Sequence, residues 1–324
     1  FKEGYAGKTL LSLSGTEKEK YQSPFTPLYS HISYIDPFQK NAESELKNII
    51  ATKSINLIWF ELIQGEAGIK PIPPSLLKQI QLLKESHDFL VGIDEVQTGL
   101  YRTGPLFNYQ IKSVTPDIIT CSKSLSDMTF PIAITLITET VYKNAQKNNP
   151  DYCNHIRNWY QSQLGSSIAF NAISKGKEEK IGYNAIKQGQ KIITKLKPLE
   201  NKSLLKEIRG EGLLIGIELI QYPLLFKVPI IKKYLATLFS ICCIKDIKNP
   251  IIVGSTLNNS HTIRIEPSLI ITNTETNLLI ETIKKNLKKS PLKLIINSFY
   301  LMVRRVHPEI YIYLSIHHYL HLQK

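Results

Sequence analysis

The sequence predicts an α/β fold built on a mostly parallel sheet, and two observations carry this prediction. Residues 57–63 form a nearly continuous apolar run, which is typical of a strand that is covered on both faces, residues 89–93 form the next buried strand, and residues 117–120 open another. Residues 73–86 lie between the first two runs and show a helical pattern, with prolines at the start and apolar residues three or four positions apart. Strands that alternate with helices in this way favour parallel pairing, because each helix returns the chain across the sheet.

Hydrophobic periodicity and its breaks define the remaining elements. Residues 1–12 are predicted to form a turn followed by a short apolar strand, and residues 42–51 a helix. Two amphipathic helices are predicted near residues 163–174 and 178–197, and Pro198 ends the second.

The predicted elements divide into two domains and a tail. Residues 1–175 are predicted to form part of a large domain. Residues 176–289 form a smaller α/β domain, which includes a strand-like run at residues 213–219. Residues 290–324, rich in Tyr, His and Ile, form a tail without an assignment.

The charge of the chain is strongly basic, with a formal net charge of +13. The lysines are scattered among Ile, Leu and Asn and form no long basic block, and no aromatic-interleaved basic platform is present. A solvated basic surface is therefore favoured over a nucleic-acid footprint, which remains the weaker alternative.

Cysteine and histidine usage argues against disulfides and metals. The four cysteines include no C-x-x-C pair, so a reducing, cytoplasmic compartment is expected. His317, His318 and His321 could share one helix turn, but no partner ligands accompany them, and no metal site is predicted. No apolar run reaches membrane-spanning length, so no membrane partner is expected.

An acid and a lysine stand at the ends of two successive predicted strands. Asp94 follows residues 89–93, and Lys123 follows residues 117–120. Ligands of open α/β sheets bind beyond the carboxyl ends of the strands. A pyridoxal phosphate enzyme needs a lysine to hold the cofactor and a carboxylate to keep the pyridine nitrogen protonated. The alternatives are a metal-binding or general-base role for Asp94, with only Glu95 as a further ligand, and a plain surface position for Lys123.

Three segments around this pair resemble class III (ornithine/4-aminobutyrate type) pyridoxal phosphate aminotransferases. Residues 61–68, ELIQGEAG, are similar to the family's E-P-I-Q-G-E-x-G segment. Residues 94–104, DEVQTGLYRTG, match its D-E-V-Q-T-G-x-x-R-T-G segment, and residues 116–118 and 122–125 match the segment that bears the cofactor lysine. The resemblance extends to about residue 289 and implies a fold-type I transferase, with the large and small domains described above.

Further segments are similar to the putrescine aminotransferase branch of this family. These are GKTL at residues 7–10, VGSTLNN at residues 253–259 and TIRIEP at residues 262–267. The resemblance implies transfer of an amino group from a diamine or ω-amino donor, with putrescine favoured, to 2-oxoglutarate. It also implies a homodimer.

The resemblance assigns four residues to the cofactor. Lys123 would hold pyridoxal 5′-phosphate covalently and move the substrate's proton, and Asp94 would pair with the ring nitrogen. Gln97 would bind near the phenolic oxygen, and Tyr5 would stack on the ring. Without the family, Tyr5 could equally be core and Gln97 a turn residue.

Three further residues are assigned to the substrates. Glu66 and Arg264 would form an ion pair that opens, so that Arg264 can bind the carboxylate of 2-oxoglutarate in a bidentate fork. Glu61 would help to shape the same pocket. Without the family, Glu66 and Arg264 would be taken as surface charges.

The chain also departs from the family around the cofactor phosphate. The family's N-terminal phosphate cradle precedes the segment where Phe1 stands, so we expect a fragment or a processed product. The family's T-F-G-G-N-P segment is replaced by NWYQSQ at residues 158–163, and its glycines after the lysine are replaced at residues 126–128. The alternative hypothesis is therefore a catalytically decayed, aminotransferase-like protein with a scaffold role.

Overall fold

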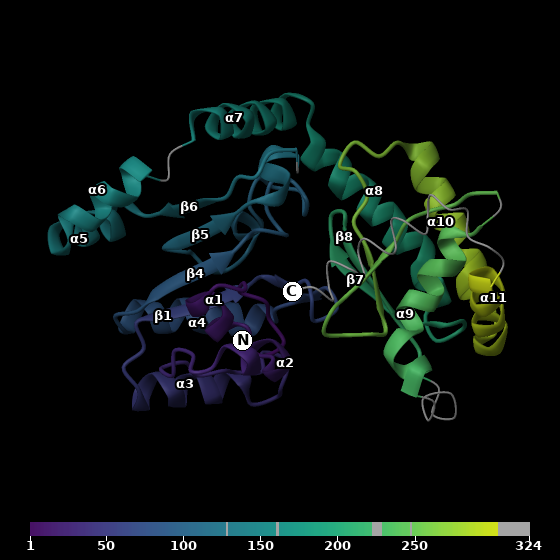
Figure 1. Ribbon diagram of the computed structural model, residues 1–324, viewed down its shortest axis with the longest axis horizontal. Coiled ribbons are helices and arrows are strands. Elements are labelled where there is room, and N and C mark those ends of the chain that lie inside the picture. The colour runs from purple at the N-terminus through teal and green to yellow at the C-terminus, as the bar shows by residue number, and fades with distance from the viewer. Residues whose placement is uncertain (128, 160–161, 222–228, 247, 304–324) are drawn as a thin grey trace. The chain divides into compact units, whose positions relative to one another are not determined.

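The computed structural model describes residues 1–127, 129–159, 162–221, 229–246 and 248–303. The chain divides into two compact units (Figure 1). Unit 1 comprises Phe1–Lys191, Arg209–Ile215 and Pro267–Ile271, and unit 2 comprises Ile192–Ile208, Gly216–Glu266 and Thr272–Lys324.

The central sheet of unit 1 has four strands in the order β1-β4-β5-β6, namely Leu57–Glu61, Leu90–Asp94, Ile118–Cys121 and Ile134–Ile137. β1, β4 and β5 are parallel, and β6 is antiparallel to β5. The register places Asp94 beside Glu61 on one side and beside Thr120 on the other. The predicted α/β fold with a mostly parallel sheet is confirmed, and the last residues of β1 and β4 lie side by side at one edge.

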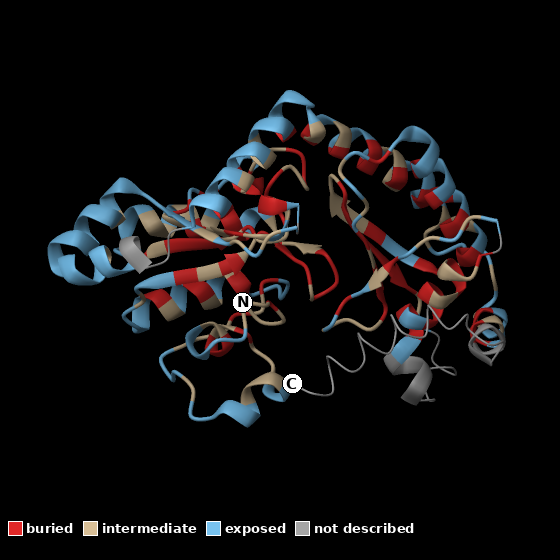
Figure 2. Cartoon of the chain, turned by 45° about the horizontal axis from the view of Figure 1, so that its top comes forward, coloured by how far each residue is buried: buried red, intermediate tan, exposed pale blue. Residues whose placement is uncertain are grey.

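Two helices complete the core of unit 1, which Figure 2 shows as buried residues along the strands. α3 spans Ala42–Thr52 and α4 spans Pro74–Ser86, close to the predicted bounds. α4 begins at a proline, whose fixed φ suits the first helical turn. The apolar faces of both helices pack with the strands in one cluster, which includes Leu46, Ile50, Leu76, Ile80, Phe60, Val91 and Ile93.

The predicted strand within residues 1–12 is wrong, because Leu10–Gly15 forms the short helix α1. The Thr9 N–H donates to Ser12 Oγ at 3.1 Å, and the Leu13 N–H donates to the Thr9 carbonyl. These local bonds satisfy the start of a helix and outweigh the apolar pattern. The next turns are α2 (Glu19–Gln22) and η1 (Ser23–Phe25).

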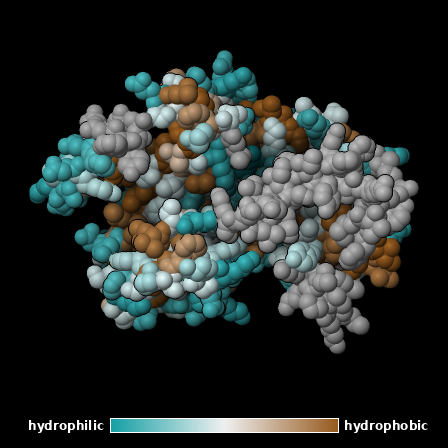
Figure 3. Space-filling model, in the orientation of Figure 1, coloured by the Kyte–Doolittle hydropathy of each residue, from teal (hydrophilic) through white to brown (hydrophobic). Residues whose placement is uncertain are grey.

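The other elements of this part of the chain are short or peripheral. β2 (Ile63–Gln64) and β3 (Lys70–Pro71) form an antiparallel pair, and η2 and η3 are turns at Asn108–Ile111 and Lys123–Ser126. α5 (Glu139–Asn148) has no buried residue, and hydrophilic residues cover this end of unit 1 at the left of Figure 3. α6, α7, α8 and η4 follow at Pro150–Trp159, Gln163–Glu178, Ile181–Leu196 and Lys197–Leu199, so both predicted amphipathic helices are present.

The second sheet has the order β7-β8-β10-β9, with strands Leu205–Glu211, Leu214–Leu219, Thr262–Ile265 and Gly254–Ser255. α9 (Pro229–Ile244), α10 (Asn273–Leu287) and α11 (Pro291–Val303) belong to unit 2. α11 packs on α9, with Leu294 and Ser298 fully buried, and Ser298 Oγ donates to the Leu238 carbonyl at 2.9 Å. The first part of the predicted tail is therefore a core helix of unit 2.

Candidate active site

Asp94 is the last residue of β4 and lies between two parallel neighbours at the carboxyl edge of the sheet. Its Oδ1 accepts a hydrogen bond from the Val96 N–H at 2.9 Å. Burial raises the pKa of Asp94, while the Val96 hydrogen bond and the positive charge of Lys123 act in the opposite direction. A carboxylate in this position favours a cationic partner.

Lys123 begins the turn η3, two residues after β5 ends. The turn is anchored on both sides of the lysine, because Ser122 Oγ donates to the Ile132 carbonyl at 2.7 Å and Leu125 is fully buried. Lys123 itself is exposed and has a positive φ of 49°. The backbone therefore presents the lysine outward from a fixed turn, near enough to Asp94 to affect its pKa.

Glu61 is the last residue of β1 and accepts two backbone hydrogen bonds. The Tyr5 N–H donates to Oε1 at 2.8 Å, and the Gly65 N–H donates to Oε2 at 3.0 Å. Burial raises the pKa of Glu61 to about 7, and the negative charges of Asp94 and Glu66 contribute to the rise. Within the described part of the chain, no Lys or Arg lies at ion-pair distance from this carboxylate.

Tyr5 and Gln97 adjoin the same carboxylates. Burial raises the pKa of the Tyr5 hydroxyl, and the charges of Glu66 and Asp94 raise it further. Gln97 packs directly on Gly65, where an added β-carbon would lie 1.7 Å from Gln97 Oε1. Only glycine at position 65 allows this approach.

All the predicted site residues except Arg264 belong to unit 1. Tyr5, Glu61, Glu66, Asp94, Gln97 and Lys123 are joined there by the hydrogen bonds, contacts and charge effects described above. Arg264 lies on β10 in unit 2, with its Nε 3.0 Å from Glu266 Oε2. Its pairing with Glu66 stays a prediction, as do the individual roles of the other residues.

Sequence reasoning missed the structural role of Glu95, because it considered this residue only as a possible metal ligand. Glu95 is fully buried and accepts a hydrogen bond from the Tyr109 N–H at 2.8 Å and another from Thr98 Oγ1. Burial raises its pKa, and these donors oppose the rise. The available signal was the threonine three residues later, a spacing at which a side chain can reach back to the carboxylate.

Sequence reasoning also missed Thr120, which lies in register with Asp94 on β5. Its Oγ1 is buried and has no hydrogen-bond partner in the structure. Buried hydroxyls are nearly always bonded, so an orphan atom beside a candidate site marks a place for a ligand atom or water. The alternation of side chains along a strand could not by itself have shown that this hydroxyl lacks a partner.

No group of three or more potential ligands occurs among the described residues. His317, His318 and His321 lie outside them. Across the same described residues, no helix has the length and apolarity needed to cross a bilayer.

The donor set at the edge of the sheet fits the ring end of pyridoxal phosphate. A desolvated carboxylate at Asp94 suits a protonated ring nitrogen, and an amine at Lys123 suits the aldehyde carbon. The orphan hydroxyl of Thr120 lies beside Asp94 and is available to a polar atom of the same group.

The family model for aminotransferase class-III matches residues 1–287. The chain belongs to this family. Class-III aminotransferases use pyridoxal phosphate, and the fold is that of fold-type I transferases, as predicted.

Solved structures of class-III relatives agree with this assignment. An ornithine aminotransferase from Toxoplasma gondii, described with partial occupancy of PLP at its active site, has 27% identity and a TM-score of 0.71 over 88% of this chain and 63% of its own. An (S)-enantioselective omega-transaminase from Thermomicrobium roseum has 22% identity and a TM-score of 0.73, with 88% and 66% covered. An omega-transaminase from Pseudomonas jessenii, in complex with PMP, has 23% identity and a TM-score of 0.72, with 88% and 66% covered. The chain thus spans slightly less than two thirds of the length of these proteins.

Proposed function

We propose that this chain is part of a pyridoxal phosphate-dependent transaminase and carries the residues that take part in the reaction. The favoured donor is a diamine or ω-amino compound, putrescine above all, and the favoured acceptor is 2-oxoglutarate. The observation that carries the proposal is the place of Asp94 at the carboxyl edge of a parallel sheet, near enough to Lys123 for the lysine's charge to act on the Asp94 pKa, in a chain of the class-III family. We further propose a cytoplasmic homodimer that binds neither nucleic acid nor membranes.

Each of the proposed site residues would have a separate role toward the cofactor. When bound, pyridoxal phosphate supplies an electron sink for negative charge that develops on the substrate's α-carbon. Asp94 would keep the ring nitrogen protonated, Lys123 would hold the cofactor and carry a proton from the α-carbon, and Tyr5 would cover the ring. Gln97, which packs against Gly65, would bind near the phenolic oxygen.

The proposed donor follows from the carboxylates. Asp94 and Glu66 both act electrostatically on Glu61, so this part of unit 1 gathers acidic side chains. A diamine is dicationic near neutral pH and is complementary to such a site. The dicarboxylate acceptor would instead require a cationic residue, the role proposed for Arg264.

The decayed-scaffold alternative has one observation in its favour. Asp127, in a position where the family has glycines, adopts φ of 50° and ψ of 32°, the left-handed conformation that favours glycine. The turn after Lys123 thus keeps a glycine-like backbone with an acidic side chain, which opposes an anionic phosphate. Cofactor binding decides between the two hypotheses.

The test is spectroscopic. Purified protein reconstituted with pyridoxal phosphate should develop a visible absorption band that shifts on addition of putrescine. Lys123→Ala should lack the band, whereas the matched surface variant Lys143→Ala should keep it, because Lys143 pairs only with the exposed Glu139. A wild-type protein that stays colourless would contradict the transaminase proposal. A band that responds to other amines but not to putrescine would contradict only the choice of donor.

A further inference from the structure

Glu61 joins two separate segments of unit 1 through a single carboxylate. One oxygen accepts from the backbone of Tyr5, and the other accepts from the backbone of Gly65, which directly precedes Glu66. Gly4 lies in ordinary contact with this link, because a β-carbon added there would lie 3.5 Å from Glu61 Oε1. One side chain therefore determines where two proposed site segments lie.

We propose that Glu61 is a positioning residue, which fixes Tyr5 and Glu66 at the site. Each of its oxygens accepts a backbone hydrogen bond, one from each of the two segments. The existence of this link is independent of the proposed transaminase function. Its consequence for the cofactor rests on that function, because it passes through the ring of Tyr5.

The charges around Glu61 make the link sensitive to its protonation. The charged groups that interact with it are Asp94 on β4, Glu66 in the following loop and the α-amino group of Phe1. Both hydrogen-bond partners of Glu61 are N–H donors, so only the ionised carboxylate offers an unprotonated oxygen to each. A glutamine at this position imitates the neutral form, since its oxygen can accept one N–H while its NH₂ group faces the other.

Amide hydrogen exchange in the Glu61→Gln protein tests the link without cofactor. Exchange at Tyr5 or at Gly65 should become about tenfold faster, which corresponds to about 1.4 kcal/mol for the loss of a charge-assisted bond. The Leu90 amide, bonded to the Asn56 carbonyl at 2.9 Å, serves as the reference for unit 1 and should keep its rate. Wild-type exchange at both Tyr5 and Gly65, with an unchanged reference, would overturn the proposal.

A matched control neutralises another buried carboxylate at the same edge. Glu95→Gln should accelerate exchange at Tyr109, whose N–H Glu95 accepts, and leave Tyr5 and Gly65 unchanged. Faster exchange at Tyr5 and Gly65 in this variant as well would show that any loss of charge loosens the site. That result would overturn the proposal that Glu61 in particular positions these two segments.

Titration with pyridoxal phosphate then tests the consequence for the site. Glu61→Gln should bind the cofactor about threefold to tenfold more weakly, as expected when one aromatic contact is misplaced. Equal affinity, together with faster exchange at Tyr5, would overturn the positioning role while leaving the transaminase proposal intact. A wild-type protein without affinity for the cofactor would contradict the transaminase proposal, and the exchange measurements would still decide whether Glu61 forms the link.

Discussion

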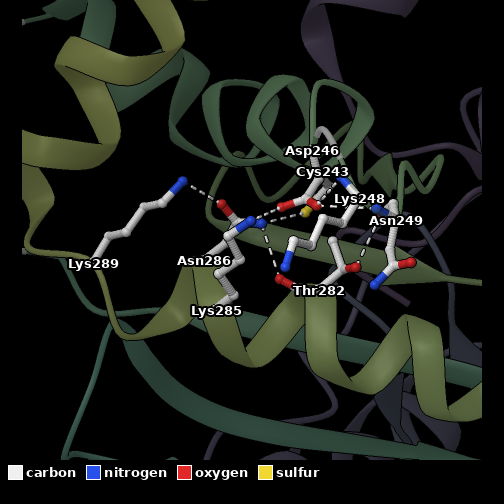
Figure 4. Close-up of polar contacts among 8 residues, drawn as sticks. All are labelled: Cys243, Asp246, Lys248, Asn249, Thr282, Lys285, Asn286 and Lys289. Carbon is white, nitrogen blue, oxygen red and sulfur yellow. Dashed lines mark hydrogen bonds and ion pairs between the residues drawn. The ribbon is translucent and has the colours of Figure 1, made fainter.

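Two carboxylates, Glu61 in unit 1 and Asp246 in unit 2, accept the same kind of backbone hydrogen bond but have pKa values that are shifted in opposite directions. Each accepts two backbone N–H groups, from Tyr5 and Gly65 in one case and from Lys248 and Asn249 in the other. Asp246 also accepts a bond from the Lys285 ammonium (Figure 4).

The pKa values of these two carboxylates differ because Glu61 is more strongly desolvated and because only Asp246 has a cationic partner. Burial raises the pKa of Glu61 to about 7. Burial also acts to raise the pKa of Asp246, but the Lys285 ammonium and the two backbone donors outweigh it and hold this pKa below its usual range.

The difference shows what a cation adds to a buried acid. Figure 4 shows that the surroundings of Asp246 form a closed network, in which Thr282 Oγ1 donates to the Asn249 carbonyl and the Asn286 side chain donates to the Thr282 carbonyl. Such a network stabilises a fold, because the Lys285 ammonium meets the charge of Asp246 directly. Around Glu61 the nearby side-chain charges that shift its pKa are negative, as expected for a site that receives a cationic substrate or cofactor group.

Removal of the Lys285 ammonium should have the largest effect on the difference between Asp246 and Glu61. Lys285→Ala would leave Asp246 buried with only its backbone donors, and we expect a loss of about 2 kcal/mol of unfolding free energy at pH 7. The lowered pKa means that this stabilisation is present above the ordinary aspartate range, near pH 4, and is lost as the pH falls through the lowered value. Urea unfolding followed by circular dichroism measures it, and a wild-type midpoint at pH 7 would contradict the assigned role of Lys285.

Neutralising Glu61 should act in the opposite sense. Its raised pKa means that the folded protein holds a proton between the ordinary glutamate range and pH 7, so wild-type stability falls as the pH rises through this window. Glu61→Gln should remove this fall, so the unfolding free energy of the variant relative to wild type should rise by about 1.5 kcal/mol between pH 4 and pH 8, on top of the pH-independent loss from the weakened bonds to Tyr5 and Gly65. Paired unfolding curves at the two pH values test this, and a difference between the two proteins that does not change with pH would refute the assigned effect of burial.

Thr120→Val should give a smaller effect on stability and a separate effect on binding. Because Oγ1 is buried without a partner, replacing the hydroxyl by a methyl group should change the unfolding free energy by about 0.5 kcal/mol or less without cofactor, and in the stabilising direction. If the hydroxyl meets a polar atom of the cofactor, the variant should bind pyridoxal phosphate several-fold more weakly. Clear destabilisation of the cofactor-free protein would show that the hydroxyl has a partner.

Lys143→Ala should give the smallest effect and sets the baseline. The pair with Glu139 is highly exposed, with 69% and 77% of the two side chains accessible, so removal should change stability by less than about 0.5 kcal/mol. A larger loss would mean that exposed ion pairs stabilise this fold. The loss measured for Lys143→Ala would then have to be subtracted from the loss measured for Lys285→Ala.

The sequence predicted best where one local pattern decided the outcome. The apolar runs located β1, β4 and β5, and the ends of two of them located Asp94 and Lys123. The segment Leu10–Gly15 was mispredicted because hydrogen bonds between Thr9 and Ser12 decided it, and apolar periodicity does not encode these bonds.

The partners of Glu61 could not be predicted, since they depend on how a segment 56 residues away folds back onto β1. The interleaving of the two units was equally hidden. Residues 209–215 and 267–271 belong to unit 1 although residues of unit 2 separate them in sequence.

The helix α11 has a practical consequence for how the protein is divided. The family match ends at residue 287, whereas the apolar side chains of Leu294 and Ile295 lie in the core of unit 2 beyond that point. A protein cut at the family boundary would expose the surface of α9 that now lies under α11, including the buried Leu238 and Cys242. Newly exposed apolar surface of this kind tends to self-associate, so we expect a protein that ends at this boundary to aggregate.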